Sequence, residues 1–82
     1  MNTKKRTYPI TMLSEGQSAN IENIQGCENA RKKLTDLGII PGKLIQVVSG
    51  MGNGPRVVKV GETKIMIGKG MFMKIFISLD NE

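Results

Sequence analysis

A single stretch of the sequence has apolar residues spaced as in an α-helix, and the remainder alternates or is interrupted by glycine. Four apolar residues recur at steps of three, four and three positions: Cys27, Ala30, Leu34 and Leu37. This spacing places them on one side of a helix, facing a core. Glu28 lies in the first turn, where a negative charge suits the helix dipole. The pattern predicts one helix, near Glu28–Leu37, in a chain that is otherwise β.

The residues that follow this helix predict where it ends. Gly38 is a good stop, because the residue after a helix often needs positive φ. Ile39 would then contact Leu34 and complete a Schellman-type cap. Pro41 and Gly42 follow as a turn, since proline fixes φ and glycine accepts positive φ. Gly38, Pro41 and Gly42 are therefore predicted to be structural turn residues that lead into a strand.

Short alternating runs lie on both sides of the helix and are typical of strands. They cover residues 18–24, 43–49, 56–60, 64–67 and 73–79. Ile24 falls out of phase with Ala19 and Ile21, which predicts a bulge near Asn23. The last run predicts four residues facing the core: Met73, Ile75, Ile77 and Leu79. The fold class is therefore mainly β: a small, partly open barrel of about five strands, with one short helix inserted after the first strand.

The length of 82 residues corresponds to one domain. Residues 1–9 are polar and without periodicity, which predicts a flexible N-terminal arm before a barrel domain at 10–82. No apolar run approaches the ~20 residues of a membrane span, and none follows the basic start as in a secretory signal. The single cysteine cannot form an internal disulfide. We therefore expect a cytoplasmic location without insertion into a membrane.

Catalysis is not indicated, because the chain has no histidine and so lacks the commonest general base and metal ligand. Cys27 has no base to activate it, and the carboxylates are dispersed. Met66, Met71 and Met73 could suggest a soft-metal site, but the inward position of Met73 favours core filling. We expect no catalytic residue, no metal ligand, no cofactor and no tight iron(II) binding by the monomer; a weak site shared between two molecules stays open.

The net charge of +5 permits contact with nucleic acid, anionic lipid or an acidic protein surface. The basic residues are scattered, however. Single-stranded nucleic acid is bound by aromatic rings that stack on its bases from a basic strand face, and this chain has only three aromatic residues, Tyr8, Phe72 and Phe76. The glycine-rich segments 50–54 and 68–70 lack the residues of a phosphate loop and read as turns. No nucleic-acid partner is expected, and steeply salt-dependent binding would identify one.

The glycine-rich hairpin tip between the second and third predicted barrel strands is the first choice for a partner contact. Met51, Asn53 and Arg56 offer an apolar, a hydrogen-bonding and a cationic side chain within a short span, a mixture found at protein interfaces. The alternative is an ordinary flexible hairpin. Phe76 is the competing contact residue, because the alternation turns it outward; its structural reading is a ring covered by the N-terminal segment through Ile10 or Leu13.

The order of several short motifs resembles the FeoA family. They are Met12-Leu13-Ser14-Glu15-Gly16, Ala19-Asn20-Ile21, Leu37-Gly38-Ile39-Ile40-Pro41-Gly42, Gly54-Pro55 and Val58-Lys59-Val60-Gly61, over about Thr11 to Leu79. The resemblance implies an SH3-like barrel and a small cytoplasmic accessory or regulatory protein of ferrous iron transport, which contacts the FeoB membrane permease. A nucleic-acid-binding small barrel and a transition-metal-responsive binding domain are the alternatives. The sequence departs from relatives at Gly68–Met71, where they commonly carry a polar, helix-prone turn. The oligomeric state is left open.

Overall fold

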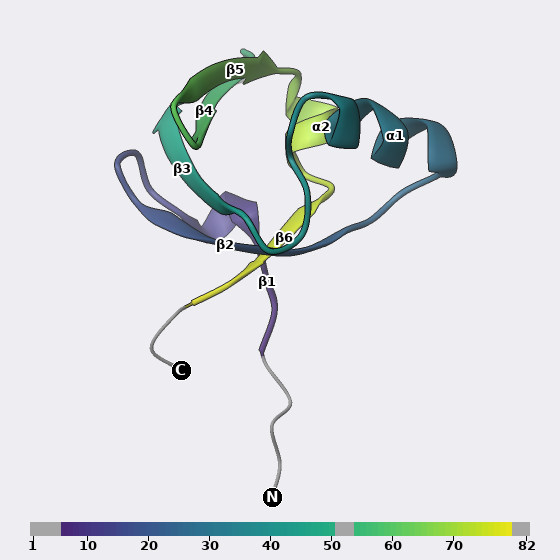
Figure 1. Cartoon of the computed structure of the whole chain (residues 1–82). Helices are drawn as coiled ribbons and strands as arrows, with labels where there is room; N and C mark the ends of the chain where they lie inside the picture. Colours follow the sequence, from purple (N-terminus) through teal and green to yellow (C-terminus); the bar gives the residue numbers. More distant parts are fainter. Residues whose placement is uncertain (1–5, 51–53, 80–82) are drawn as a thin grey trace, which may run out of the picture.

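The computed structural model describes residues 6–50 and 54–79 of the chain. Along the sequence it contains nine elements: β1 Tyr8–Pro9, the 3-10 helix η1 Ile10–Met12, β2 Ser18–Ile24, α1 Glu28–Asp36, β3 Leu44–Ser49, β4 Arg56–Val60, β5 Thr63–Ile67, α2 Lys69–Phe72 and β6 Ile75–Ser78. Figure 1 shows the strands curling around a common interior, with the two helices beside the open part of the curl. The predicted class, a mainly β and partly open barrel, is confirmed.

The strands form one six-stranded sheet in the order β1-β6-β2-β3-β4-β5. Every neighbouring pair is antiparallel. One strand more than predicted is present, because Tyr8 and Pro9 pair with Ile77 and Phe76 of β6. Tyr8 also packs against the core. The last two residues of the predicted flexible arm, Tyr8 and Pro9, therefore belong to the sheet.

The interior of the curl is filled by aliphatic side chains from every strand except β1. The core cluster consists of Ile10, Ala19, Ile21, Ile24, Leu34, Ile39, Ile45, Val47, Val58, Val60, Ile65, Ile67, Phe72, Ile75 and Ile77. Burying one such large side chain contributes roughly 1.5–3 kcal/mol relative to leaving it exposed. Ile65 and Ile67 face inward as their alternation predicts, and so do Ile75 and Ile77.

The predicted helix is confirmed as α1, but only its two central apolar residues face the core. Ala30 and Leu34 are buried. Cys27 is exposed, because it is the N-cap with extended backbone and precedes the first helical turn. Leu37 is 46% exposed at the C-cap, where the chain leaves the helix. The inward positions predicted for Cys27 and Leu37 are therefore wrong.

The helix ends in the predicted Schellman motif. Gly38 has φ of 94°, and its N–H donates to the Thr35 carbonyl at 2.9 Å. The Ile39 N–H donates to the Leu34 carbonyl, also at 2.9 Å. These two bonds satisfy carbonyls that the helix end would otherwise leave unpaired.

The turn after the helix is the predicted one as well. The Lys43 N–H donates to the Ile40 carbonyl at 3.2 Å, and Gly42 between them has φ of 97°. Proline at the first central position and a positive-φ glycine at the second are typical of a type II turn. The Gly42 N–H donates to the Ile21 carbonyl at 2.8 Å, so the turn is anchored to β2.

Replacing Gly38 with valine is expected to destabilise the protein by about 1–2 kcal/mol, because a β-branched residue resists positive φ. No neighbouring atom obstructs a Cβ there, so the cost comes from the backbone alone. Gly54→Val is the matched control, since a Cβ at Gly54 also meets nothing and its φ lies outside the restricted range. Chemical denaturation measures both. Equal losses would contradict the cap.

The predicted bulge is present in β2. The pairing with β6 shifts between Ile21, opposite Ile77, and Asn23, opposite Phe76. One residue of β2 is therefore extra at this point, and this puts Ile24 on the same side as Ile21. Ile24 is buried as a result.

The last strand is shorter than predicted, because the turn that follows α2 occupies its first two positions. Met73 is the C-cap of α2 in helical conformation and is 52% exposed. Leu79 follows β6 and is 38% exposed. The inward positions predicted for Met73 and Leu79 are therefore wrong. Phe72 is buried in place of Met73, and Met71 packs partly buried against the core.

Candidate binding site

A groove of about 490 Å³ opens where β4 begins. Its lining comes from four parts of the chain: η1 with the segment after it, β3 with the residue after it, the first residue of β4, and α2. The lining residues are Thr11, Leu13, Ser14, Glu15, Val47, Gly50, Arg56 and Phe72. Leu13, Val47 and Phe72 supply apolar surface, whereas Glu15 and Arg56 supply opposite charges.

Arg56 is half-buried and held from two sides. Its guanidinium carbon lies 5.4 Å from the centre of the Phe72 ring, within the range of a cation–π contact. Its Nη1 donates to the Gly54 carbonyl at 3.0 Å. The Arg56 side chain also lies against Gly50, where a Cβ would collide with Arg56 Cδ. The guanidinium is therefore held in one place by its neighbours, that is, pre-positioned.

The opposite wall of the groove is fixed to β3 by backbone hydrogen bonds. The Gly16 N–H donates to the Val47 carbonyl at 2.7 Å, and the Val47 N–H donates to the Gln17 carbonyl at 3.0 Å. Glu15 Oε2 accepts from the Gly50 N–H at 3.3 Å. The Ser14 N–H donates to Gln17 Oε1 at 2.7 Å. Hydrogen bonds within the chain therefore hold both walls of the groove in place.

The groove combines apolar, charged and hydroxyl-bearing side chains. Leu13, Val47 and Phe72 give it apolar surface, the Arg56 guanidinium is a hydrogen-bond donor suited to carboxylate or carbonyl oxygens, and hydroxyls and Glu15 line the other wall. None of the lining residues pairs a nucleophile with a base. Arginine beside aromatic and aliphatic surface is a combination enriched at protein interfaces.

Of the four predicted contact residues, Arg56 lines this groove, and its contact with a partner remains a prediction. Met51 and Asn53 lie outside the described residues, so their contribution to the contact remains a prediction. Phe76 is on a different surface and does not line the groove.

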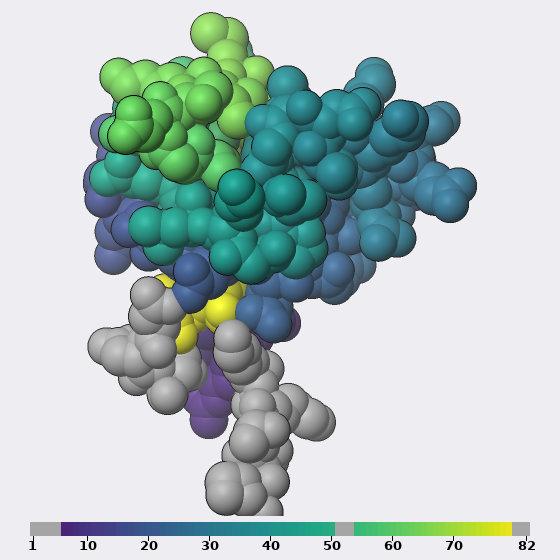
Figure 2. All heavy atoms as spheres, viewed as in Figure 1, coloured from purple at the N-terminus to yellow at the C-terminus, as the bar shows by residue number. Residues whose placement is uncertain are grey.

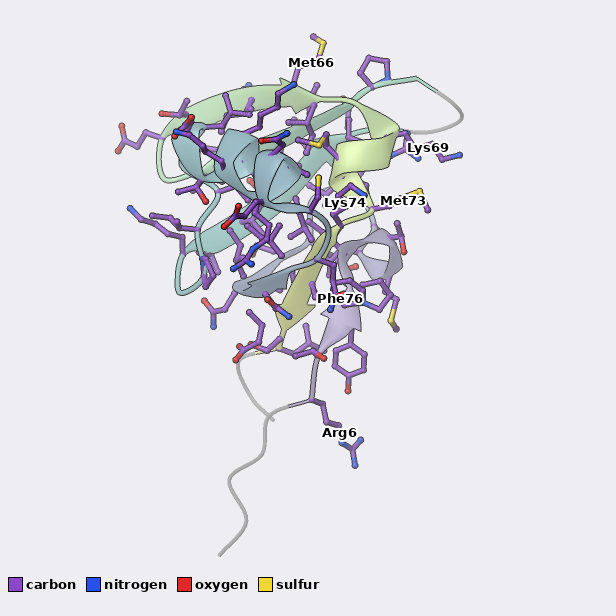
Figure 3. All side chains as sticks on the ribbon, turned by 90° about the vertical axis from the view of Figure 1, so that its right-hand side faces the viewer. Arg6, Met66, Lys69, Met73, Lys74 and Phe76 are labelled. Atoms are coloured by element: carbon purple, nitrogen blue, oxygen red, sulfur yellow. The ribbon has the colours of Figure 1, made fainter. Side chains whose placement is uncertain are left out.

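Phe76 is half-buried on β6. Its register partners are Pro9 of β1 and Asn23 of β2, and residues directly opposite in antiparallel strands have side chains on the same face. The ring is thus flanked by Pro9 of the N-terminal segment, whereas the predicted cover was Ile10, which is buried in the core, or Leu13, which packs against the core. Figure 3 places Phe76 below α2, with Lys69 and Met73 above it.

Sequence reasoning missed Leu13, Glu15 and Phe72 as parts of the site. The sequence predicts a turn at 68–70 and a strand from Met73, and Phe72 between them carried no signal of a site. Residues 69–72 form α2 despite Gly70, so this chain has a short helix where the resemblance implies a helix-prone turn in relatives.

The N-terminus of α1 holds the only cysteine of the chain. The backbone N–H groups of Ala30 and Asn29, together with the charge of Lys74, lower the pKa of the exposed Cys27 thiol below its ordinary value. Among the described residues, no group of three or more acidic, cysteine or histidine side chains is placed to hold a metal ion. Across residues 6–50 and 54–79, no helix is long and apolar enough to cross a membrane.

Comparison with known proteins assigns this fold to a family. The sequence matches the FeoA domain over residues 8–79. It is 30% identical over 70 residues to a putative Fe(2+) transport protein A of Methanocaldococcus jannaschii, covering 85% of this chain and 84% of that protein. A crystal structure of an iron uptake regulatory protein (FeoA) aligns with a TM-score of 0.82 and 33% identity, covering 89% of this chain and 97% of the other.

The SH3-like character of the fold comes from a further neighbour. A zinc complex of Stenotrophomonas maltophilia FeoA, described as a prokaryotic SH3 domain protein, aligns with a TM-score of 0.72 and 21% identity. The alignment covers 87% of this chain and 88% of the other. The sequence match, the archaeal relative and the shared fold agree: the chain belongs to the FeoA family.

Proposed function

We propose that this protein is a cytoplasmic accessory of ferrous iron transport that acts by binding the cytoplasmic region of a FeoB-type permease and performs no chemistry itself. The family supports the transport role. So do the relatives, since one is named for Fe(2+) transport and another is described in terms of activating ferrous iron transport.

The observation that carries the contact is the pre-positioned guanidinium of Arg56 at the edge of an apolar groove. Phe72 and Gly54 fix it in place. A permease segment would insert an apolar side chain between Leu13 and Val47 and present a carboxylate or carbonyl oxygen to Arg56. The tip residues Met51 and Asn53, which follow Gly50 in the sequence, extend the proposed contact.

The alternative of nucleic-acid binding gains no support from the aromatic residues. Phe72 is 3% exposed, and its ring lies under Arg56. Tyr8 is partly buried against the core. A stacking platform needs rings that are open to bases on a basic face.

Arg56→Ala is expected to weaken binding to the purified cytoplasmic region of the permease roughly 30-fold, the effect of losing a central arginine anchor. Lys32→Ala is the charge-matched control, because Lys32 makes only an exposed contact with Asp36 on α1; it should bind like the parent. Biolayer interferometry at fixed ionic strength gives the affinities.

One further variant, Phe76→Ala, separates the competing surfaces. If Phe76→Ala loses binding while Arg56→Ala binds like the parent, the contact lies at Phe76 and the groove assignment is wrong. If the folded parent protein binds no part of the permease at micromolar concentration, the proposed function itself fails.

A further inference from the structure

The two edge strands of the sheet differ in how they are protected from pairing with another chain. β1 is only two residues long and includes Pro9, which has no N–H to donate. β5 is five residues long, contains no proline and pairs with β4 in continuous register, without a bulge. Short strands, prolines, bulges and charged side chains are the usual protection of an edge, and β5 has only the last of these, in Lys64.

The outer edge of β5 is open in the part of the chain that the structure describes. β4 is its one strand neighbour there. In Figure 1, β5 lies in front of the paler β4, so its other edge is turned toward the viewer. Figure 2 shows the green atoms of this hairpin on the same side, with no atoms drawn over them.

The hairpin turn determines which backbone groups of β5 point outward. Val60 pairs with Thr63, and Gly61 between them has φ of 63°, as in a two-residue type II′ hairpin. The Thr63 N–H therefore faces the Val60 carbonyl. Hydrogen-bonded and non-hydrogen-bonded pairs then alternate along the ladder. The N–H and C=O groups of Lys64 and Met66 consequently point away from β4.

The outer face beside this edge is basic. Lys64 lies directly opposite Lys59 of β4, and Lys59 opposite Gln46 of β3. Like charges opposite each other destabilise an antiparallel pair, and neither β3, β4 nor β5 contains an acidic residue. Lys59 also lines a depression of about 370 Å³ together with Lys43. Met66, the next outward residue of β5, is 68% exposed.

We propose that the free edge of β5 binds an extended segment of another protein as an added antiparallel strand. The segment carries an apolar residue opposite Met66 and, two positions later, Asp or Glu opposite Lys64. The outward groups of these two residues supply the hydrogen bonds, the carboxylate neutralises the Lys59–Lys64 pair, and the apolar residue covers Met66. No residue of β5 lines the Arg56 groove, so this inference does not depend on the proposed permease contact.

A second copy of this chain fits the edge less well. The antiparallel register that uses both sets of outward groups places Lys64 of one copy opposite Met66 of the other. It then brings two Lys59–Lys64 pairs together without a carboxylate, in two molecules that each carry a net charge of +5. Repulsion between like charges opposes that arrangement, whereas an acidic strand removes it.

The test uses two end-blocked nonapeptides with Val-Thr-Glu or Val-Thr-Lys at the centre and threonine elsewhere. Binding of the Glu peptide is expected to slow amide exchange at Lys64 and Met66, measured by nitrogen-15 NMR. The amides of Ile65 and Ile67 already face β4 and should change little. The Lys peptide should bind about fivefold more weakly, the effect of one cross-strand charge pair.

Two variants make the assignment specific. Met66→Pro removes one outward N–H, and proline is tolerated on an edge strand whose N–H faces solvent; it should weaken binding of the Glu peptide about tenfold. Lys64→Glu should reverse the preference, so that the Lys peptide binds about fivefold more tightly than the Glu peptide. The charge reversal keeps the proposal testable if the proline variant does not fold.

Several outcomes would overturn the proposal. One is that the amide exchange rates of Lys64 and Met66 stay unchanged with millimolar Glu peptide, and another is that the two peptides bind equally well. A third is that these amides become protected without peptide as the protein concentration rises, which would assign the edge to a second copy. Arg56→Ala should bind the Glu peptide like the parent. Failure at the β5 edge and failure at the Arg56 groove are therefore distinguishable.

Discussion

Replacing Leu34 with alanine is expected to destabilise the protein by about 3 kcal/mol, within the range of buried Leu→Ala changes. Leu34 is 0% exposed and joins α1 to the barrel core. A domain of this size has a stability of only about 3–5 kcal/mol from its core, so the variant should be largely unfolded near 37 °C. Thermal and urea denaturation followed by circular dichroism measure the loss.

Leu37→Ala is the matched control, since it removes the same atoms from the same helix end. Leu37 is 46% exposed and occupies the C-cap, so its loss should cost less than about 1 kcal/mol. If the buried helical face ran from Cys27 to Leu37, as spacing alone predicts, the two variants would lose similar amounts of stability. Similar losses would therefore contradict the observed end of α1.

This pair of leucines shows what spacing can and cannot predict. Apolar spacing correctly identified α1 and its core contacts at Ala30 and Leu34, because those residues lie within the regular helix. The same spacing failed at Cys27 and Leu37, which are caps. Cys27 has extended backbone before the first turn, and Leu37 follows the last residue of α1, so the periodicity of the regular helix does not extend to either side chain. The glycine and proline signals at Gly38 and Gly42 succeeded because they concern backbone conformation directly.

The last strand shows a different limit. Met73 is in phase with Ile75 and Ile77, so alternation alone extends the strand to it. The short helix α2 contains Gly70 and has little intrinsic preference for helix. It forms where Phe72 can enter the core, and this tertiary gain outweighs the local propensity. A short stretch of sequence does not show that Phe72 can reach the core, so the stabilisation from its burial could not be predicted locally.

The candidate groove was only partly predictable for the same reason. Arg56 was identified from its place after a glycine-rich tip. Its supports, Phe72 and Gly50, and the facing Leu13 come from segments that only the folded chain brings together. A single sequence carries no signal that pairs residue 13 with residue 56. The β5 edge likewise required the strand order, because the sequence alone does not say which strand lacks a neighbour.

Gly50→Ala is expected to destabilise the protein by about 2–3 kcal/mol, combining backbone strain with a steric collision. Gly50 has φ of 146°, which alanine rarely adopts. A Cβ there would also collide with Arg56 Cδ and lie 3.2 Å from Arg56 Cα. Arg56 could yield only by giving up its contacts with Phe72 and the Gly54 carbonyl.

A double-mutant cycle separates the two causes. In the Arg56→Ala background the Cδ atom is gone, so Gly50→Ala should cost only about 1–2 kcal/mol, the share that belongs to the backbone. The coupling of about 1 kcal/mol between the two positions is measured by urea denaturation of the four proteins. Additive effects would mean that Arg56 is not held against Gly50. If the coupling is present, Gly50→Ala should also weaken the proposed permease contact, because displacing the guanidinium from the Phe72 ring removes the pre-positioned donor on which that contact depends.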